Sequence, residues 1–180
     1  LLNKKGWRGI NIDIDRKSIE LFNLFRRKDL NINLAVSSIK GELEYINFHE
    51  KSPINMIKTS KNESSHSAEK IEKIKSDTLN SIIEKSPYRD KKIDFVSIDV
   101  EGHEIEVIKG FNLKKYRPSI IVIEYLDMSL EKIEIKNFNL KNIINSEIYK
   151  LMIENEYHMV NWLHSDLIFA HNSFRETKYD

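Results

Sequence analysis

Three carboxylates surround one glycine directly after the most apolar strand that the sequence predicts. The stretch IDFVSIDVEGHEIEVIKG, residues 93–110, places Asp99, Glu101 and Glu104 around Gly102. Burying a carboxylate at the end of a strand is costly unless a partner satisfies it. Carboxylates held in this way can take a proton from a reacting group or supply the oxygen ligands that Mg²⁺ prefers. We therefore regard Asp99 and Glu101 as candidate catalytic residues.

The residues that follow this strand admit more than one interpretation. His103 is a third candidate base, because the ordinary pKa of histidine lies at about 6.5. A single histidine at the start of a helix is also commonly a solvated surface residue. Glu104 is expected in the first turn of the next helix, where the helix dipole favours an acid. Gly102 permits the sharp turn into that helix.

Other acids end other predicted strands. Asp13 closes the first strand pattern, and Glu124 lies near the end of a β-branched run. In open parallel sheets, ligands bind beyond the carboxyl ends of the strands. We therefore expect carboxylates from Asp13, Asp99 and Glu124 to converge on one rim. Asp99 and Glu101 would share a face if their strand continues through Val100.

Strand and helix patterns alternate along the chain. Strands are predicted over residues 9–14, 31–38, 42–48, 92–100 and 118–125, and as a final hairpin with its turn at 164–166. Helices are predicted over residues 15–27, 76–86, 103–110 and 146–156. This order predicts a three-layer α/β fold with a mainly parallel sheet and an antiparallel pair at its end.

The stretch 49–76 differs in character from the rest of the chain. It is polar and rich in lysine, and it contains Pro53 but no glycine. We expect an exposed excursion there. Lys70, Lys73 and Lys75 are expected on the solvated face of a short helix.

Composition narrows the classes of function. The 180 residues are 40% hydrophobic and 32% charged, which suits one domain spanning residues 1–180. The 29 basic and 28 acidic side chains leave a net charge of +1, so no broad charge favours nucleic acid or an acidic membrane. The chain has no cysteine and no apolar run long enough to span a bilayer. We expect a cytoplasmic protein without a nucleic-acid or membrane partner.

The acid-rich stretch resembles a known family. IDFVSIDVEGHEIEVIKG, followed by YRPSIIVIE, is similar to the signature region of FkbM-type S-adenosylmethionine-dependent methyltransferases. The upstream segments KKGWRGINIDIDRKSIELF, NINLAVSS and SDTLNSIIEK also resemble that family, so the similarity covers residues 4–125 in order. It implies a Rossmann-like class I methyltransferase fold. The implied reaction is methyl transfer from S-adenosylmethionine to a hydroxyl oxygen of a sugar or natural product.

The resemblance also implies roles for individual residues. Asp13 matches the acid that holds the ribose hydroxyls of the cofactor, and Ser37 is expected near the adenine. Asp99 and Glu101 match the motif that faces the transferred methyl group and the acceptor, so Asp99 would contact the cofactor as well. Glu124 matches the acidic end of the fifth strand and would bind the acceptor with Glu101.

The family's glycine-rich loop has no counterpart in the sequence. That loop should precede residue 1, and no G-x-G cluster is formed by Gly6, Gly9, Gly41, Gly102 or Gly110. Because the chain starts at Leu1 without a methionine, we expect an N-terminally truncated domain that lacks the first strand and this loop. Such a domain would bind the cofactor poorly or not at all.

We favour methyl transfer without a metal. Two alternatives stay open. Asp99, Glu101 and Glu124 could bind Mg²⁺ and so orient a diol acceptor. The histidines lack the spacing of zinc ligands, so we assign no metal residue. The chain could also be a non-catalytic binding or assembly module that keeps the fold without the cofactor loop.

Overall fold

The computed structural model describes residues 2–47, 55–58, 70–125 and 139–176. These residues form two compact units, residues 1–90 and residues 91–180, and each is described here by itself. Both units combine helices with strands, so the predicted α/β class is confirmed.

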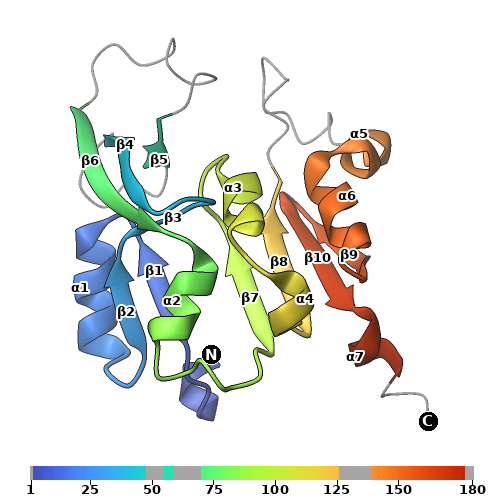
Figure 1. Ribbon diagram of the computed structural model, residues 1–180, viewed down its shortest axis with the longest axis horizontal. Coiled ribbons are helices and arrows are strands. Elements are labelled where there is room, and N and C mark those ends of the chain that lie inside the picture. Colours follow the sequence, from blue (N-terminus) through green and yellow to red (C-terminus); the bar gives the residue numbers. More distant parts are fainter. Residues whose placement is uncertain (1, 48–54, 59–69, 126–138, 177–180) are drawn as a thin grey trace. The chain divides into compact units, whose positions relative to one another are not determined.

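The first unit begins with a strand, a helix and a parallel strand (Figure 1). A short 3₁₀ helix, η1 (Asn3–Lys5), precedes β1 (Ile10–Asp13), α1 (Arg16–Phe25) and β2 (Leu30–Asn33). The Asp15 carboxylate accepts hydrogen bonds from the amides of Lys17 and Ser18, so it caps α1.

A second sheet of the first unit has four strands. Its order is β3 (Ala35–Val36), β6 (Lys70–Asp77), β4 (Gly41–Asn47) and β5 (Met56–Ile57). β3 runs parallel to β6, whereas β4 is antiparallel to both β6 and β5. The predicted single strand over 31–38 is therefore wrong: it breaks at Leu34 into β2 and β3, which belong to different sheets.

The predicted lysine-bearing helix is also wrong, because Lys70, Lys73 and Lys75 lie on strand β6. β6 pairs with β4 along the whole of β4, and Lys73 forms an ion pair of 3.3 Å with Glu42. Within the stretch 49–76, the described residues thus include strands β5 and β6, and the remainder lies outside the described residues. Helix α2 (Leu79–Lys85) follows β6 and is capped by Thr78.

The second unit is built on one mixed sheet (Figure 1). Its order is β7 (Phe95–Ile98), β8 (Ile120–Glu124), β10 (Asp166–His171) and β9 (Tyr157–Leu163). β7 and β8 are parallel, and β10 is antiparallel to both β8 and β9. The predicted terminal hairpin is confirmed. A single mainly parallel sheet is not confirmed, because the described strands form three sheets, of which β1–β2 is parallel and the other two are of mixed direction.

The core of the second unit lies on one face of this sheet. Ile121 and Ile123 of β8 and Leu167 and Phe169 of β10 are fully buried and alternate with less buried neighbours. Helix α6 contacts both β9 and helix α3. The helices of this unit are α3 (Glu104–Lys109), α4 (Leu113–Tyr116), α5 (Leu140–Asn145), α6 (Glu147–Glu154) and α7 (Asn172–Glu176).

The sequence predicts α3 and α6 but neither α4 nor α5. Both of these short helices begin at an asparagine whose side chain accepts from a backbone amide, Asn112 for α4 and Asn139 for α5. Among the described helices, none has both the length and the apolar character that crossing a bilayer requires.

Candidate active site

The parallel pair β7 and β8 brings two acids to one edge of the second sheet. Ile98 of β7 is in register with Ile123 of β8, so both strands end at the same level. Asp99 directly follows the last residue of β7, and Glu124 is the last residue of β8. The predicted meeting of Asp99 with Glu124 at a strand-end rim is therefore confirmed within this unit.

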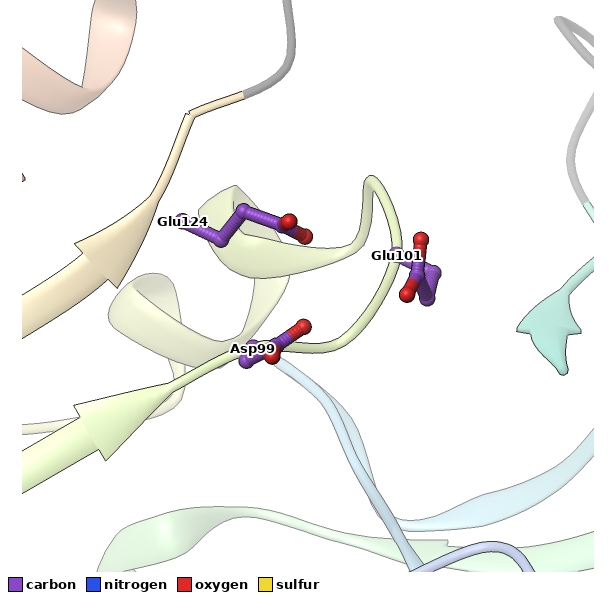
Figure 2. Close-up of side chains that lie close together, drawn as sticks. All are labelled: Asp99, Glu101 and Glu124. Atoms are coloured by element: carbon purple, nitrogen blue, oxygen red, sulfur yellow. The ribbon is translucent and has the colours of Figure 1, made fainter. Parts of the chain in front are cut away.

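Glu101 joins these two acids to form a cluster of three carboxylates. Figure 2 shows the three side chains turned toward the same space from β7, β8 and the loop after β7. One oxygen from each of Asp99, Glu101 and Glu124 lies within 4.8 Å of the other two. We call these three residues the carboxylate cluster.

The backbone after β7 brings Glu101 into the cluster by a route that the sequence did not predict. The strand ends at Ile98, so Asp99 and Glu101 do not share a face through strand alternation. Instead, Glu101 has φ of 53° and Gly102 has φ of 93°, both in the left-handed region. Glycine adopts that region freely, whereas a glutamate does so at a cost. The tight turn made by this pair of residues reverses the chain toward α3.

Glu104 is a further functional candidate. The sequence predicts for it only a position in the first turn of a helix. Its side chain is buried, and its Oε1 atom accepts hydrogen bonds from the amides of Val100 and Gly102, at 3.2 and 3.0 Å. The signal that could have found it is the spacing D-x-E-G-x-E, which sets Glu104 two residues after the turn glycine.

Crowding and burial alter the proton affinity of the cluster. Burial, followed by the charges of Asp99 and Glu101 and a hydrogen bond with Asp99, raises the pKa of Glu124 to about 8. Burial and the charges of Asp99 and Glu104 also raise the pKa of Glu101. Carboxylates this close repel one another when all are ionised. At neutral pH the cluster therefore retains a proton.

The raised pKa of Glu124 assigns that proton to its carboxyl group. Glu124 Oε2 is buried and receives no hydrogen bond from any residue that the structure describes. Two ionised carboxylates cannot hydrogen-bond to each other, since neither has a donor. A protonated Glu124 carboxyl can donate the hydrogen bond to Asp99 that contributes to its raised pKa. Asp99 itself is exposed, so the burial cost that the sequence analysis attached to Asp99 applies to Glu124 instead.

His103 occupies the position directly before α3. It is buried rather than solvated, so the interpretation as a surface histidine is wrong. Burial, opposed by the charge of Glu106, lowers the pKa of His103, which favours a neutral imidazole. The carboxylate cluster found among the described residues does not include it. A catalytic role for His103 stays a prediction.

The two remaining predicted site residues, Asp13 and Ser37, belong to the first unit. Asp13 ends β1, and its Oδ1 atom accepts from the amide of Asp15 at 2.8 Å. Ser37 follows β3, is buried, and donates its amide to the carbonyl of Asp77 at 3.1 Å. Because the cluster lies in the second unit, a common site for Asp13 and Asp99 stays a prediction.

In the first unit, Asp77 is bonded to Ser37 through its backbone, and its carboxylate accepts hydrogen bonds from Thr78, Ser81 and Lys85. Burial alone would raise its pKa, but bonds from Lys85, Thr78 and Ser81 lower it, so the group stays ionised. A hollow of about 290 Å³ adjoins it, and its lining combines apolar side chains with two charged ones: Leu30, Ile32, Leu34, Ile82, Asp77 and Lys85. The predicted position of an adenine near Ser37 stays a prediction.

Comparison with known proteins identifies the family. Residues 1–165 match the model of the methyltransferase FkbM domain, a range that includes the first unit, the second unit as far as Ser165 and the whole carboxylate cluster. No curated protein and no solved structure shows a significant match. The match extends over most of the chain and includes the strand ends from which the cluster is built. The chain therefore belongs to the FkbM methyltransferase family.

Proposed function

We propose that this methyltransferase moves a methyl group from S-adenosylmethionine to a hydroxyl oxygen of a small acceptor, such as a sugar or another natural product. The observation that carries the proposal is the carboxylate cluster at the ends of β7 and β8, in a chain of this family. A cluster that combines a retained proton with ionised oxygens can both bind hydroxyl groups and accept a proton.

The same proposal includes a Rossmann-like arrangement of the complete domain. Two features support it: the parallel pair β1 and β2 connected through α1, and the parallel pair β7 and β8 connected through α3 and α4. Strand–helix–strand crossovers between parallel neighbours are the units from which such sheets are built.

In the proposed reaction, a carboxylate of the cluster activates the acceptor. Bound S-adenosylmethionine supplies a methyl group that its positively charged sulfur activates. Glu101 takes the hydroxyl proton while the acceptor oxygen forms its bond to the methyl carbon and the carbon–sulfur bond breaks. The raised pKa of Glu101 makes it a stronger base than a solvent-exposed glutamate. Asp99 and Glu124 hold the acceptor by its remaining hydroxyl groups.

Asp13 is the residue that would hold the ribose of the cofactor. Its carboxylate lies at the end of a parallel strand, and the amide of Asp15 fixes its orientation. A carboxylate with these properties suits the two adjacent hydroxyl groups of a ribose. The carboxylate at the end of β1 can thus accept hydrogen bonds from a nucleoside. In this proposal Asp13 binds and orients the nucleoside without taking part in proton transfer.

The test uses S-adenosylmethionine with a tritiated methyl group and a panel of methyl glycosides and simple polyols. Glu101→Gln should lower kcat by about 10²- to 10⁴-fold, the range for loss of a general base. Asp99→Ala should abolish transfer while the circular dichroism spectrum is unchanged. Glu154→Gln, an exposed acid on α6, is the matched control. Full turnover of both cluster variants would remove the cluster from the mechanism.

Cofactor binding is tested separately by calorimetry. Asp13→Asn should weaken binding of S-adenosylmethionine by about 10- to 100-fold, since a charged acceptor of two hydrogen bonds is lost. If the chain is instead a non-catalytic module, neither S-adenosylmethionine nor S-adenosylhomocysteine should release heat.

A divalent cation is a second candidate occupant of the cluster, favoured by the approach of three carboxylate oxygens to within 4.8 Å. Mg²⁺ binds oxygen ligands of this kind and could orient a diol. Transfer that survives chelation with EDTA would dismiss this candidate. Transfer that EDTA stops and Mg²⁺ restores would establish it in place of the metal-free reaction.

A further inference from the structure

Glu104 is the first residue of α3, and its burial separates it from the other acid in that turn. Its exposed fraction is 4%, whereas the side chain of Glu106, in the same turn, is 37% exposed and pairs with Lys109 at 3.2 Å. An acid that only complements the helix dipole has no need to be buried, and Glu106 shows that the same turn offers a solvated position. The burial of Glu104 therefore requires another explanation.

The hydrogen bonds of Glu104 supply that explanation. Its Oε1 atom accepts from the amides of Val100 and Gly102, the residues on either side of Glu101. Hydrogen bonds to a charged acceptor are stronger than those between neutral groups. The two bonds clamp the backbone immediately before and after Glu101.

The clamped segment has a backbone conformation that is unfavourable unless other residues stabilise it. Glu101 has φ of 53° and Gly102 has φ of 93°. A non-glycine residue in the left-handed region stays there only when its surroundings impose that conformation. Without the clamp, the loop after β7 would relax toward ordinary backbone conformations and carry the Glu101 side chain away from Asp99 and Glu124.

The surroundings of the Glu104 carboxyl group also fit a role in holding the loop. The pKa of Glu104 is raised overall, because burial and the charge of Asp99 outweigh the bonds from its own amide and from those of Gly102 and Val100, which lower it. The backbone amides thus offset part of the cost of burying a carboxylate. An apolar side chain at this position would leave the two loop amides without their acceptor.

We propose that Glu104 is a positioning residue of the active site, which clamps the loop after β7 and so sets the Glu101 carboxylate opposite Asp99 and Glu124. This inference rests on the proposed function for its catalytic consequence. Its structural part, the clamp itself, does not.

The first experiment needs neither cofactor nor acceptor. Amide hydrogen exchange is followed by NMR in the wild type, Glu104→Asp, Glu104→Gln and the control Glu106→Gln. Aspartate keeps the charge but is shorter by one methylene group, so the amides of Val100 and Gly102 should exchange about 10- to 100-fold faster than in the wild type. Glutamine keeps an acceptor oxygen at the same reach and should largely restore protection. Glu106→Gln should leave both amides unchanged.

The second experiment measures methyl transfer with the same variants and the best acceptor of the glycoside and polyol panel. Glu104→Asp should lower kcat by about 10²-fold, as expected for a displacement of about 1 Å. Its KM for S-adenosylmethionine should stay near the wild-type value. Glu104→Gln should recover most of the rate, which a role based on charge alone would not allow.

The outcomes separate this inference from the proposed function. If the exchange changes occur but no variant or wild type transfers methyl groups, the clamp stands and the proposed reaction falls. If Val100 and Gly102 keep their protection in Glu104→Asp, the clamp is refuted whatever the activity. If Glu104→Asp does not fold, rapid exchange of both amides in the wild type, or equal loss of rate in Glu104→Gln and Glu104→Ala, would refute it as well.

Discussion

Glu124 holds its proton well above the pH at which a solvated glutamate loses it. Its carboxyl group shares a small volume with Asp99 and Glu101, and one of its oxygens is buried without a donor among the described residues. The usual expectation of three negative charges at neutral pH therefore does not hold for this cluster. The retained proton makes Glu124 a donor as well as an acceptor, which suits recognition of a hydroxyl group.

This proton makes folding sensitive to pH in a defined direction. Glutamate in the unfolded chain titrates near the ordinary pKa of 4.5, whereas the pKa of folded Glu124 is raised to about 8. Between these values the folded state binds more protons, so the free energy of unfolding falls as the pH rises. The stabilising contribution is complete below pH 4.5 and lost through pH 8.

The Glu124→Gln variant tests this directly. Its free energy of unfolding, measured by urea denaturation from pH 5 to pH 9 in EDTA, should decline less with pH than that of the wild type. The variant should be the more stable protein at pH 9. Glu154→Gln controls for removal of an exposed acid from the same unit. Parallel curves for Glu124→Gln and the wild type would show that Glu124 is ionised across this range.

At the scale of elements, the turn between β7 and α3 determines the site. Parallel pairing of β7 with β8 accounts for Asp99 and Glu124, but Glu101 depends on two consecutive left-handed residues. A shorter or more extended connection would direct the Glu101 side chain elsewhere. The precision of the cluster therefore depends on the backbone conformation of one short loop.

Gly102→Ala isolates the contribution of this turn. A Cβ atom at Gly102 would meet no atom within 4 Å, so the cost comes from its φ of 93° alone. We expect the free energy of unfolding to fall by about 1 to 2 kcal/mol. Gly9→Ala is the matched control, since it also has open space but no positive φ. Equal effects of the two substitutions, measured by thermal and urea unfolding, would contradict the assigned role of the turn.

The elements also show why sequence patterns succeeded in some places and failed in others. α1 was predictable because Asp15 supplies a local cap and Ile19 and Phe22 have helical spacing. β6 was not, because Ile71 and Ile74 are three residues apart and mimic a helix. β6 pairs with β4, which lies far away in the sequence, so no local sequence pattern indicates that β6 is a strand.

Prediction of the site had a similar limit. Asp99 and Glu124 follow from a general rule about the ends of parallel strands. The position of Glu101 and the burial of Glu104 depend on left-handed backbone conformations and side-chain-to-backbone bonds, which leave no periodic pattern. The hexapeptide DVEGHE shows that carboxylates are present. It does not show which of them belong to the cluster and which accepts bonds from the loop backbone.

At the scale of the whole chain, the last strand, β10, is required for the sheet of the second unit. The family match ends at residue 165, yet β10 begins at Asp166 and lies between β8 and β9. Its side chains Leu167 and Phe169 are fully buried. The second unit therefore needs residues beyond the matched region in order to form its sheet.

Ending the chain after Ser165 should accordingly unfold the second unit. The loss of β10 leaves β8 and β9 without the strand that joins them and exposes the apolar core. Circular dichroism and a two-dimensional NMR spectrum should show loss of dispersed signals from residues 91–165. A chain that ends after Glu176 keeps every described element and is the control. Dispersed signals from β8 in the shorter chain would contradict this requirement.

The clamp around Glu101 is local, since Glu104 reaches back only two and four residues. The six residues from Asp99 to Glu104 thus contain two acids of the carboxylate cluster, Asp99 and Glu101, together with the bonds that shape their loop. Such a self-contained module is suited to transplantation: placed between a parallel strand and a helix of an unrelated designed scaffold, it should fold into the same turn and carry its charges with it.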